Sequence, residues 1–342
     1  MEFFNKKILI TGVCGTVGSE LLRQIVSNEK PLHLICIDNN ESNLFDMQQK
    51  YKDKDNVAFS IADIRDPKTC RDISVGVDII FHVAGLKHVY LCENSPLEAI
   101  NTNILGVQNI IDAGIYNNVE KVIFTSSDKA VNPSSVMGTS KLMAERLITS
   151  ANLQQSLNKG PQFISTRFGN VLGSRGSVIP IFIDQIKNGG PVTLTDENMT
   201  RFIMSIEEAA HLIITSSQIA KGGEVFITKM PVVAIKDIAE VLIKELAPKN
   251  GFKESDIEIV NIGVKPGEKI FEELMSEEEI RRSIELENYF VVKPAFMDMY
   301  TNIEYSYENI ISSKVEEHYR SSSQKKLTHD EIKQFLIKNK IL

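Results

Sequence analysis

The sequence lacks several features that mark specialised classes of protein. Its four cysteines form no CxxC pair and have no histidine at ligand spacing, so neither a disulfide framework nor a metal site is expected. The formal net charge of −7 disfavours general affinity for nucleic acid or anionic membranes. No stretch approaches the roughly 20 consecutive apolar residues that cross a bilayer, and the amino terminus does not resemble a secretion signal. We therefore expect a cytoplasmic protein with no membrane span, no metal and no nucleic-acid partner.

The composition is otherwise that of an ordinary globular enzyme. Apolar residues make up 42% of the chain and charged residues 24%, without internal repeats or low-complexity tracts. A chain of 342 residues is long enough for one large α/β unit or for two fused lobes.

Short apolar runs alternate with helical patterns along much of the chain. The runs predicted to be buried strands are residues 7–10, 32–37, 57–61, 77–83, 122–124 and 162–167. Helical spacing of apolar residues is clearest over 97–116. Alternation of this kind predicts an α/β fold with a doubly wound parallel (Rossmann) sheet.

A glycine pattern follows the first predicted strand. Gly12, Gly15 and Gly18 allow a tight turn, close approach of backbone amides to a pyrophosphate, and close packing of the next helix on the strand. The helix start near Thr16 and Val17 would add a partial positive charge. These residues predict a dinucleotide-binding turn.

Asp38 ends the second predicted strand, about twenty residues after Gly18. A carboxylate at this place binds the adenosine ribose and repels a 2′-phosphate. Asn39, Asn40 and Glu41 follow, so no basic residue stands ready for such a phosphate. The motif therefore favours NAD over NADP, with Asn39 beside Asp38 in the site.

The sequence changes character near residue 168, where loop-like, glycine-containing sequence replaces the alternation. We assign residues 1–167 to an NAD-binding Rossmann domain, to which a strand near 224–228 should return. Residues 168–342 should form mainly a smaller C-terminal substrate lobe. Within this lobe we predict a strand at 192–195 and helices at 236–247, 268–276 and within 327–342, the last capped at Thr328. Residues 285–326 carry no pattern that we can use.

The stretch Lys121–Arg146 carries the most chemistry. A predicted strand ends in Ser126, Ser127, Asp128 and Lys129, and polar side chains at the carboxyl end of a parallel strand lie at the ligand crevice. Adjacent Asp128 and Lys129 could supply an acid and a base to one substrate, whereas a polar loop or a static salt bridge are the alternatives. Lys141 follows in the first turns of the next helix.

The strand at 77–83 runs into Ala84, Gly85, Lys87 and His88. Small residues at 84 and 85 would let the chain pass close to the cofactor. Lys87 could contact a phosphate of substrate or cofactor. His88 remains open between substrate contact and local packing.

Four separated motifs then show a family resemblance. The segments SSDKAVNPSSVMGTSKLMAE, RFGNVLGSRGSVIPIF, GGPVTLTDENMTRFIMSIEEAAHLI and KPGEKIFEEL resemble the nucleotide-sugar 4,6-dehydratases that act on UDP-N-acetylglucosamine, within the extended short-chain dehydrogenase/reductase family. The likeness extends to about residue 290. One departure is Met137, which stands where the family at large has the tyrosine of a Tyr-x-x-x-Lys motif; a subset of these dehydratases shares the methionine.

The resemblance implies roles in the reaction. Lys129 would take the proton from carbon 5, Asp128 would protonate the hydroxyl that leaves carbon 6, and Lys141 would contact the nicotinamide ribose. Met137 has no titratable proton, so Ser127, Asp128 or a water would take the carbon 4 hydroxyl proton. Met137 would then be a packing residue beside the nicotinamide.

The resemblance also implies binding residues. Asp63 and Ile64 would lie beside the adenine, although Asp63 or Asp66 could also cap a helix. Asn103 and Ser126 would lie near the cofactor and the active-site backbone. The substrate would be held by Asn170, Ser177, Arg201, Lys265 and Glu268. Glu268 has an alternative explanation, as an acidic residue near the start of the helix predicted at 268–276.

The leading hypothesis is an NAD-dependent UDP-N-acetylglucosamine 4,6-dehydratase that works in polysaccharide biosynthesis and forms a homo-oligomer. A 4-epimerase on the same scaffold is the nearest alternative, and a catalytically silent NAD-sensing regulator is another. The product configuration at carbon 5 and the nucleotide of the substrate stay open.

Overall fold

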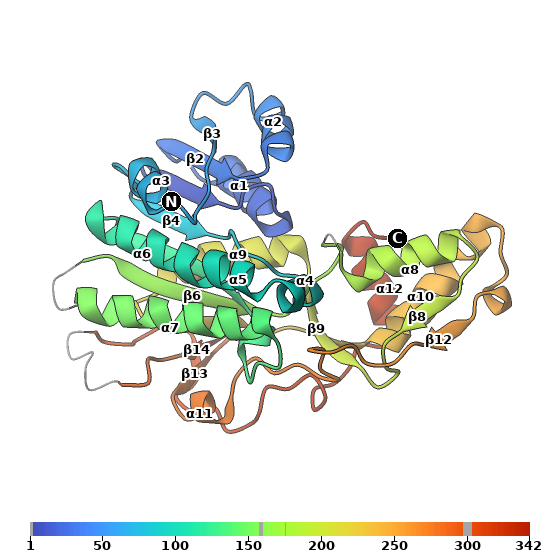
Figure 1. The fold of residues 1–342 in the computed structure, drawn as a ribbon. Coiled ribbons are helices and arrows are strands. Elements are labelled where there is room, and N and C mark those ends of the chain that lie inside the picture. Colours follow the sequence, from blue (N-terminus) through green and yellow to red (C-terminus); the bar gives the residue numbers. More distant parts are fainter. Residues whose placement is uncertain (1–2, 157–159, 175, 297–302) are drawn as a thin grey trace. The chain divides into compact units, whose positions relative to one another are not determined.

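The computed structural model describes residues 3–156, 160–174, 176–296 and 303–342, and Figure 1 shows its elements. The chain divides into two compact units. The first unit comprises Met1–Phe168, Glu207–Lys229 and Ser276–Glu317, and the second comprises Gly169–Ile206, Met230–Met275 and His318–Leu342.

The first unit is built on a large sheet whose central strands are parallel. In spatial order these are β3 (Val57–Ile61), β2 (His33–Asp38), β1 (Lys7–Thr11), β4 (Ile79–His82), β5 (Lys121–Ser127), β6 (Gln162–Phe168) and β10 (Val225–Thr228). Antiparallel strands β14 (Tyr289–Val292), β13 (Ser283–Leu286) and β15 (Ile310–Ser312) extend the sheet beyond β10. The reversal of strand order between β1 and β4 confirms the predicted doubly wound fold and creates the crevice at which such sheets bind ligands.

The first unit contains nine α-helices among its described residues. They are α1 (Thr16–Asn28), α2 (Glu41–Lys50), α3 (Pro67–Ile73), α4 (Val89–Asn94), α5 (Pro96–Ala99), α6 (Gly106–Tyr116), α7 (Val136–Ser156), α9 (Ile206–Ile219) and α11 (Glu277–Ile280). Helices α3, α6 and α7 lie next to one another on one face, over a core that includes Leu9, Ile80 and Phe124. On α1, the Gln24 side chain donates to the carbonyl of Glu207 in α9.

The helix predicted at 97–116 is present and contains an irregularity. Its middle part, Ile100–Leu105, is a π-helical turn (η1) between α5 and α6. Such turns often occur at functional sites, and this one contains Asn103.

The second unit has its own core. It contains β7 (Asn170–Val171), β8 (Val192–Leu194), β9 (Thr200–Met204), β11 (Val232–Ala234), β12 (Ile259–Asn261), α8 (Val178–Lys187), α10 (Ile235–Leu246) and α12 (His329–Lys338). Apolar residues of α8, α10 and α12 share one cluster. The strand predicted at 192–195, the helix at 236–247 and the Thr328 cap of the last helix are confirmed.

Other predictions need correction. Residues 268–276 form no helix, because their backbone groups bond to distant segments: the Ile270 carbonyl accepts from Thr200, and the Leu274 N–H donates to Tyr319. The uninterpreted range 285–326 includes sheet strands β14 and β15. The strand expected near 224–228 does return to the sheet as β10, and the first unit also takes in Ser276–Glu317, beyond the range assigned from the sequence.

Candidate active site

The β1–α1 turn has the geometry of an anion site. Gly12 has φ +70°, and a Cβ on it would lie 2.6 Å from the Ala84 Cα, so a larger residue would collide with the end of β4. Helix α1 begins at Thr16 after Gly15, has no side-chain cap and carries no acidic residue in its first turn. The N–H groups of that turn, including Val17 and the buried Gly18, therefore suit an external anion such as a pyrophosphate.

Asp38 lies beside this turn at the end of β2. Its Oδ2 accepts from the Cys14 N–H at 3.0 Å and its Oδ1 from the Asn40 N–H at 3.0 Å, while Asn39 is exposed. These bonds fix the carboxylate next to the glycine turn. A carboxylate oxygen can accept more than one hydrogen bond, so Asp38 can still accept from a ribose hydroxyl.

Of the two residues expected near the adenine, Asp63 forms an ion pair and Ile64 is buried in the core. Asp63 pairs with Arg65, 2.6 Å between Oδ2 and Nη2, and this hydrogen bond lowers the pKa of the Asp63 carboxyl. Asp66, rather than Asp63, caps α3 by accepting from the Lys68 N–H. Ile64 is buried in the core beneath Gly106.

Asn103 fixes the loop that follows β4. Its Oδ1 accepts from the Leu86 N–H at 2.8 Å, and its Nδ2 donates to the Leu86 carbonyl at 3.0 Å and to Ser140 Oγ at 2.9 Å. Asn103 thus ties this loop to the helix that carries Lys141. In the loop, Gly85, Lys87 and His88 are exposed. The part of the His88 ring that is buried and the nearby Lys87 charge both lower the pKa of His88.

The end of β5 brings the predicted acid and base together. Asp128 is fully buried, whereas 28% of the Lys129 side chain is exposed. Asp128 Oδ1 accepts from Ser127 Oγ at 2.6 Å, from the Lys129 N–H at 2.9 Å and from Lys129 Nζ at 3.0 Å. Ser126 Oγ is buried and has no hydrogen-bond partner among the described residues.

Lys141 is buried in α7 near the same strand. Its Nζ donates to the Thr125 carbonyl at 3.1 Å and lies 4.8 Å from the centroid of the Phe124 ring. Burial lowers the pKa of Lys141 to about 8, and the carboxylate of Glu145 opposes that shift. Met137, one turn before Lys141, packs against Cys92 and Ala99 and is 2% exposed, as expected of a packing residue.

Three of the predicted substrate residues, all in the second unit, have a buried polar atom without a hydrogen-bond partner among the described residues. Asn170 Oδ1, Ser177 Oγ and Glu268 Oε2 are buried without a hydrogen-bond partner in the described part of the chain. Buried polar atoms of this kind are rare and commonly mark a place for water or a ligand. Glu268 is not near a helix start, so the alternative explanation by a helix dipole is excluded.

The Arg201 guanidinium is already hydrogen-bonded to the backbone, whereas Lys265 is exposed. Arg201 donates to the carbonyls of Thr200, Lys269 and Ile270, at 2.8, 2.7 and 3.2 Å. Its guanidinium therefore holds the backbone just after Glu268. Lys265 is exposed on the turn that precedes Glu268.

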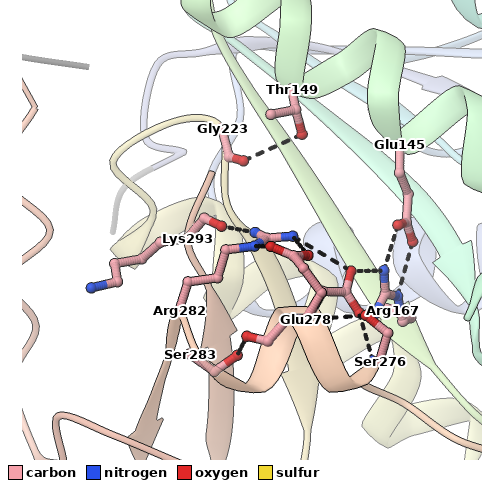
Figure 2. A network of polar contacts seen from close by, with 10 residues as sticks. Glu145, Thr149, Arg167, Gly223, Ser276, Glu278, Arg282, Ser283 and Lys293 are labelled. Carbon is pink, nitrogen blue, oxygen red and sulfur yellow. Dashed lines mark hydrogen bonds and ion pairs between the residues drawn. The ribbon is translucent and has the colours of Figure 1, made fainter. Parts of the chain in front are cut away.

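One polar network in the first unit escaped the sequence interpretation. Arg167 at the end of β6 is completely buried and hydrogen-bonds to Glu145 of α7 and to Glu279 of α11. Figure 2 shows Arg167 and Glu145 in this network. The only sequence signal was a charged residue at the end of a predicted buried strand, and that signal does not name its partners.

Comparison with known proteins identifies the family of this chain. A family model described as polysaccharide biosynthesis protein matches residues 8–294. The chain belongs to that family. An uncharacterized membrane protein of Methanocaldococcus jannaschii is 50% identical over 295 residues, covering 86% of this chain and 87% of that protein. A UDP-glucose 4-epimerase of Rickettsia bellii is 37% identical over 342 residues, covering 98% and 96%.

Two solved structures resemble this member of the polysaccharide biosynthesis family, one over the whole chain and one over about three quarters of it. Pen from Bacillus thuringiensis has a TM-score of 0.91 at 40% identity, with both chains covered completely. The dTDP-glucose 4,6-dehydratase DesIV from Streptomyces venezuelae, solved with NAD, has a TM-score of 0.67 at 20% identity, covering 77% of this chain and 86% of that one. The second likeness shows the fold alone. In the described part of the chain, every helix is too short or too polar to cross a membrane.

The close packing of α7 on the Asp128–Ala130 turn generates a prediction. A Cβ on Gly138 would lie 2.3 Å from the Lys129 carbonyl oxygen, so Gly138→Ala must push the helix and the turn apart. We expect turnover to fall at least tenfold, since small misplacements of reacting groups are costly. Steady-state kinetics would measure this, with the exposed Thr139→Ala as control. Native turnover in Gly138→Ala would show that this packing does not position the site.

Proposed function

We propose that this protein is an NAD-dependent 4,6-dehydratase of UDP-N-acetylglucosamine or a related nucleotide sugar. The observation that carries the proposal is the contact between Asp128 and Lys129. Water elimination across carbons 5 and 6 needs one base and one acid close together, and Lys129 Nζ lies 3.0 Å from Asp128 Oδ1.

The protonation states of this pair fit the reaction. An ion pair of Lys129 and Asp128 contains the same number of protons as a neutral amine beside a neutral carboxylic acid. One proton transfer along the hydrogen bond therefore interconverts the two forms. Complete burial of Asp128 makes its charged form costly, whereas the three hydrogen bonds to its Oδ1 stabilise that form. The neutral pair, which is the reactive one, is therefore one proton transfer away from the ion pair.

The neutral pair can then perform the elimination. The Lys129 amine takes the proton from carbon 5, and the Asp128 carboxyl gives its proton to the hydroxyl that leaves carbon 6. The pair ends as Lys129 ammonium and Asp128 carboxylate, and transfer of the proton between them restores the starting state. Ser127, which donates to the same Asp128 oxygen at 2.6 Å, orients the carboxyl.

NAD fits the residues of the first unit. The uncapped start of α1 would hold the pyrophosphate and Asp38 the adenosine ribose, while Asp63 and Ile64 would lie beside the adenine. Lys141 would contact the nicotinamide ribose, with the unpartnered Ser126 hydroxyl nearby. The chemistry that bound NAD would supply is reversible hydride transfer, from carbon 4 of the sugar and back to carbon 6.

The second unit would supply the sugar-nucleotide contacts. Asn170, Ser177 and Glu268 have unsatisfied buried polar atoms, and the Lys265 ammonium is exposed for a phosphate. Arg201 supports the backbone beside Glu268, and its bonds to that backbone favour a positioning role over direct contact with the pyrophosphate. Lys87 and His88, exposed after β4, are further candidates for substrate contact.

A nucleotide-sugar 4-epimerase is the second candidate, because a relative that covers nearly the whole chain carries that name. Epimerisation at carbon 4 needs no acid and base for carbons 5 and 6, so it leaves the Asp128–Lys129 contact without a use. A catalytically silent NAD-sensing protein would form no product from any nucleotide sugar.

The test is incubation with UDP-N-acetylglucosamine without added cofactor, followed by mass spectrometry. We expect a product that has lost one water; a product of unchanged mass with inverted carbon 4 would instead establish the epimerase. Lys129→Ala should reduce water loss by about 10²–10⁴-fold, as expected for removal of a general base. Lys236→Ala, which removes a lysine from an exposed ion pair, is the matched control. Native turnover in Lys129→Ala would refute the assigned role.

Cofactor selection gives a second prediction. Asp38→Ala should weaken NAD binding about ten- to a hundredfold, because a hydrogen bond to a charged group is lost. NADP binding should change less, since the variant also loses the repulsion of the 2′-phosphate. Binding isotherms for both cofactors measure this, with the exposed Asp46→Ala as control. Equal affinities of the native protein for NAD and NADP would contradict the role of Asp38.

The packing of Met137 gives a third prediction. Met137→Leu should retain most of the turnover, since the volumes are similar and such changes usually cost under about 1.5 kcal/mol of stability. Loss of turnover without loss of folding would mean that the thioether has a chemical role. Ser127→Ala then tests the carbon 4 step: slower oxidation of the substrate in a single turnover would identify Ser127 as the proton acceptor, and a native rate would leave that role to Asp128 or water.

A further inference from the structure

The buried network in Figure 2 has more negative than positive groups at its centre. Arg167 makes paired hydrogen bonds to Glu145, at 3.0 and 2.5 Å, and to Glu279, at 3.0 and 2.9 Å. All three side chains are at most 5% exposed. Burial alone would raise the pKa of Glu279, but Arg167 outweighs it and lowers that pKa to about 2, so the carboxylate stays charged. One guanidinium between two carboxylates leaves one negative charge, which Arg282, 3.9 Å from Glu279, balances in part.

Glu145 is the member of this network nearest to the active site along α7. It follows Lys141 by four residues, a spacing that places two side chains on the same face of a helix. Arg167 binds both of its oxygens and so fixes its position. The outer carboxylate, Glu279, is held by the Ser276 N–H and lies 3.9 Å from Arg282.

Three titratable groups in the described part of the chain act on the Lys141 ammonium or respond to it: Glu145, Cys92 of α4 and His82 of β4. Burial raises the pKa of Cys92 and lowers that of His82 to about 3, so both are neutral at pH 7. Glu145 is the member of the three that forms an ion pair, with Arg167. Its carboxylate therefore offsets part of the cost of burying the Lys141 charge.

We propose that Glu145 is a positioning residue for the active-site lysine, and that Arg167 and Glu279 hold it where its carboxylate keeps Lys141 protonated. The consecutive elements α7 and β6, together with the distant α11, thus act on one ammonium group. The inference rests on the proposed role of Lys141 at the nicotinamide ribose, because an ammonium can donate to ribose hydroxyls and a neutral amine does so less well.

The test measures the protonation of Lys141 directly. In protein labelled with 13C-lysine, the pH titration of the Lys141 Cε signal reports its pKa. Glu145→Gln should lower this pKa by on the order of one pH unit, because loss of a nearby negative charge disfavours the ammonium. The alkaline limit of NAD binding should move down by the same amount. Glu145→Asp, which keeps the charge, should leave both values near native even if the protein becomes less stable.

A second variant keeps the inference testable if Glu145→Gln does not fold. In Glu279→Gln, Arg167 would be balanced by Glu145 alone, so the field of Glu145 at Lys141 should weaken and the pKa should fall by a smaller amount. Glu277→Gln removes a carboxylate from an exposed position of the same helix and is the control. An unchanged Lys141 pKa in the folded variants would overturn the inference. Neither readout uses a sugar substrate, so failure of the dehydration assay would refute only the proposed function.

Discussion

The first unit depends on the buried ion network around Arg167. A guanidinium with no exposure requires partners, and its two carboxylates come from α7 and from α11, more than a hundred residues away in the chain. Breaking such a network by removing one partner typically costs about 3–5 kcal/mol, because an uncompensated charge stays buried. The network therefore joins the parallel half of the sheet to the segment that supplies its antiparallel strands, and it fixes the helix that carries Lys141.

The candidate active site uses the backbone more than long side chains to set its geometry. Asn103 holds both backbone groups of Leu86, and Gly138 lets α7 approach the Asp128–Ala130 turn. Against this fixed frame only a few polar atoms stay unsatisfied, such as Ser126 Oγ. A bound cofactor and a short-range proton transfer both require a fixed backbone and a small number of polar atoms that are not yet hydrogen-bonded.

The Asp128–Lys129 contact shows how one arrangement permits two interpretations. As an ion pair it would be an ordinary salt bridge, and exposed examples contribute about 0–1 kcal/mol. Because Asp128 is completely buried, charge is costly there, and the neutral form of the pair becomes accessible by a single proton transfer. Burial thus distinguishes this contact from an exposed salt bridge, and burial is decided by the fold and not by the local sequence pattern.

The sequence by itself determined the features that arise from local pattern. Apolar runs and helical spacing gave the parallel strands, and the Gly12 to Gly18 turn and the strand-end residues Asp38 and Ser126 to Lys129 marked the candidate site. Tertiary structure decided what depends on distant partners. Residues 268–276 have a helical composition, yet their backbone bonds to β9 and to the segment near Tyr319. Arg201 donates to that same backbone, and Arg167 pairs with Glu279. Buried polar groups need hydrogen-bond partners, and only the fold decides which partners are within reach.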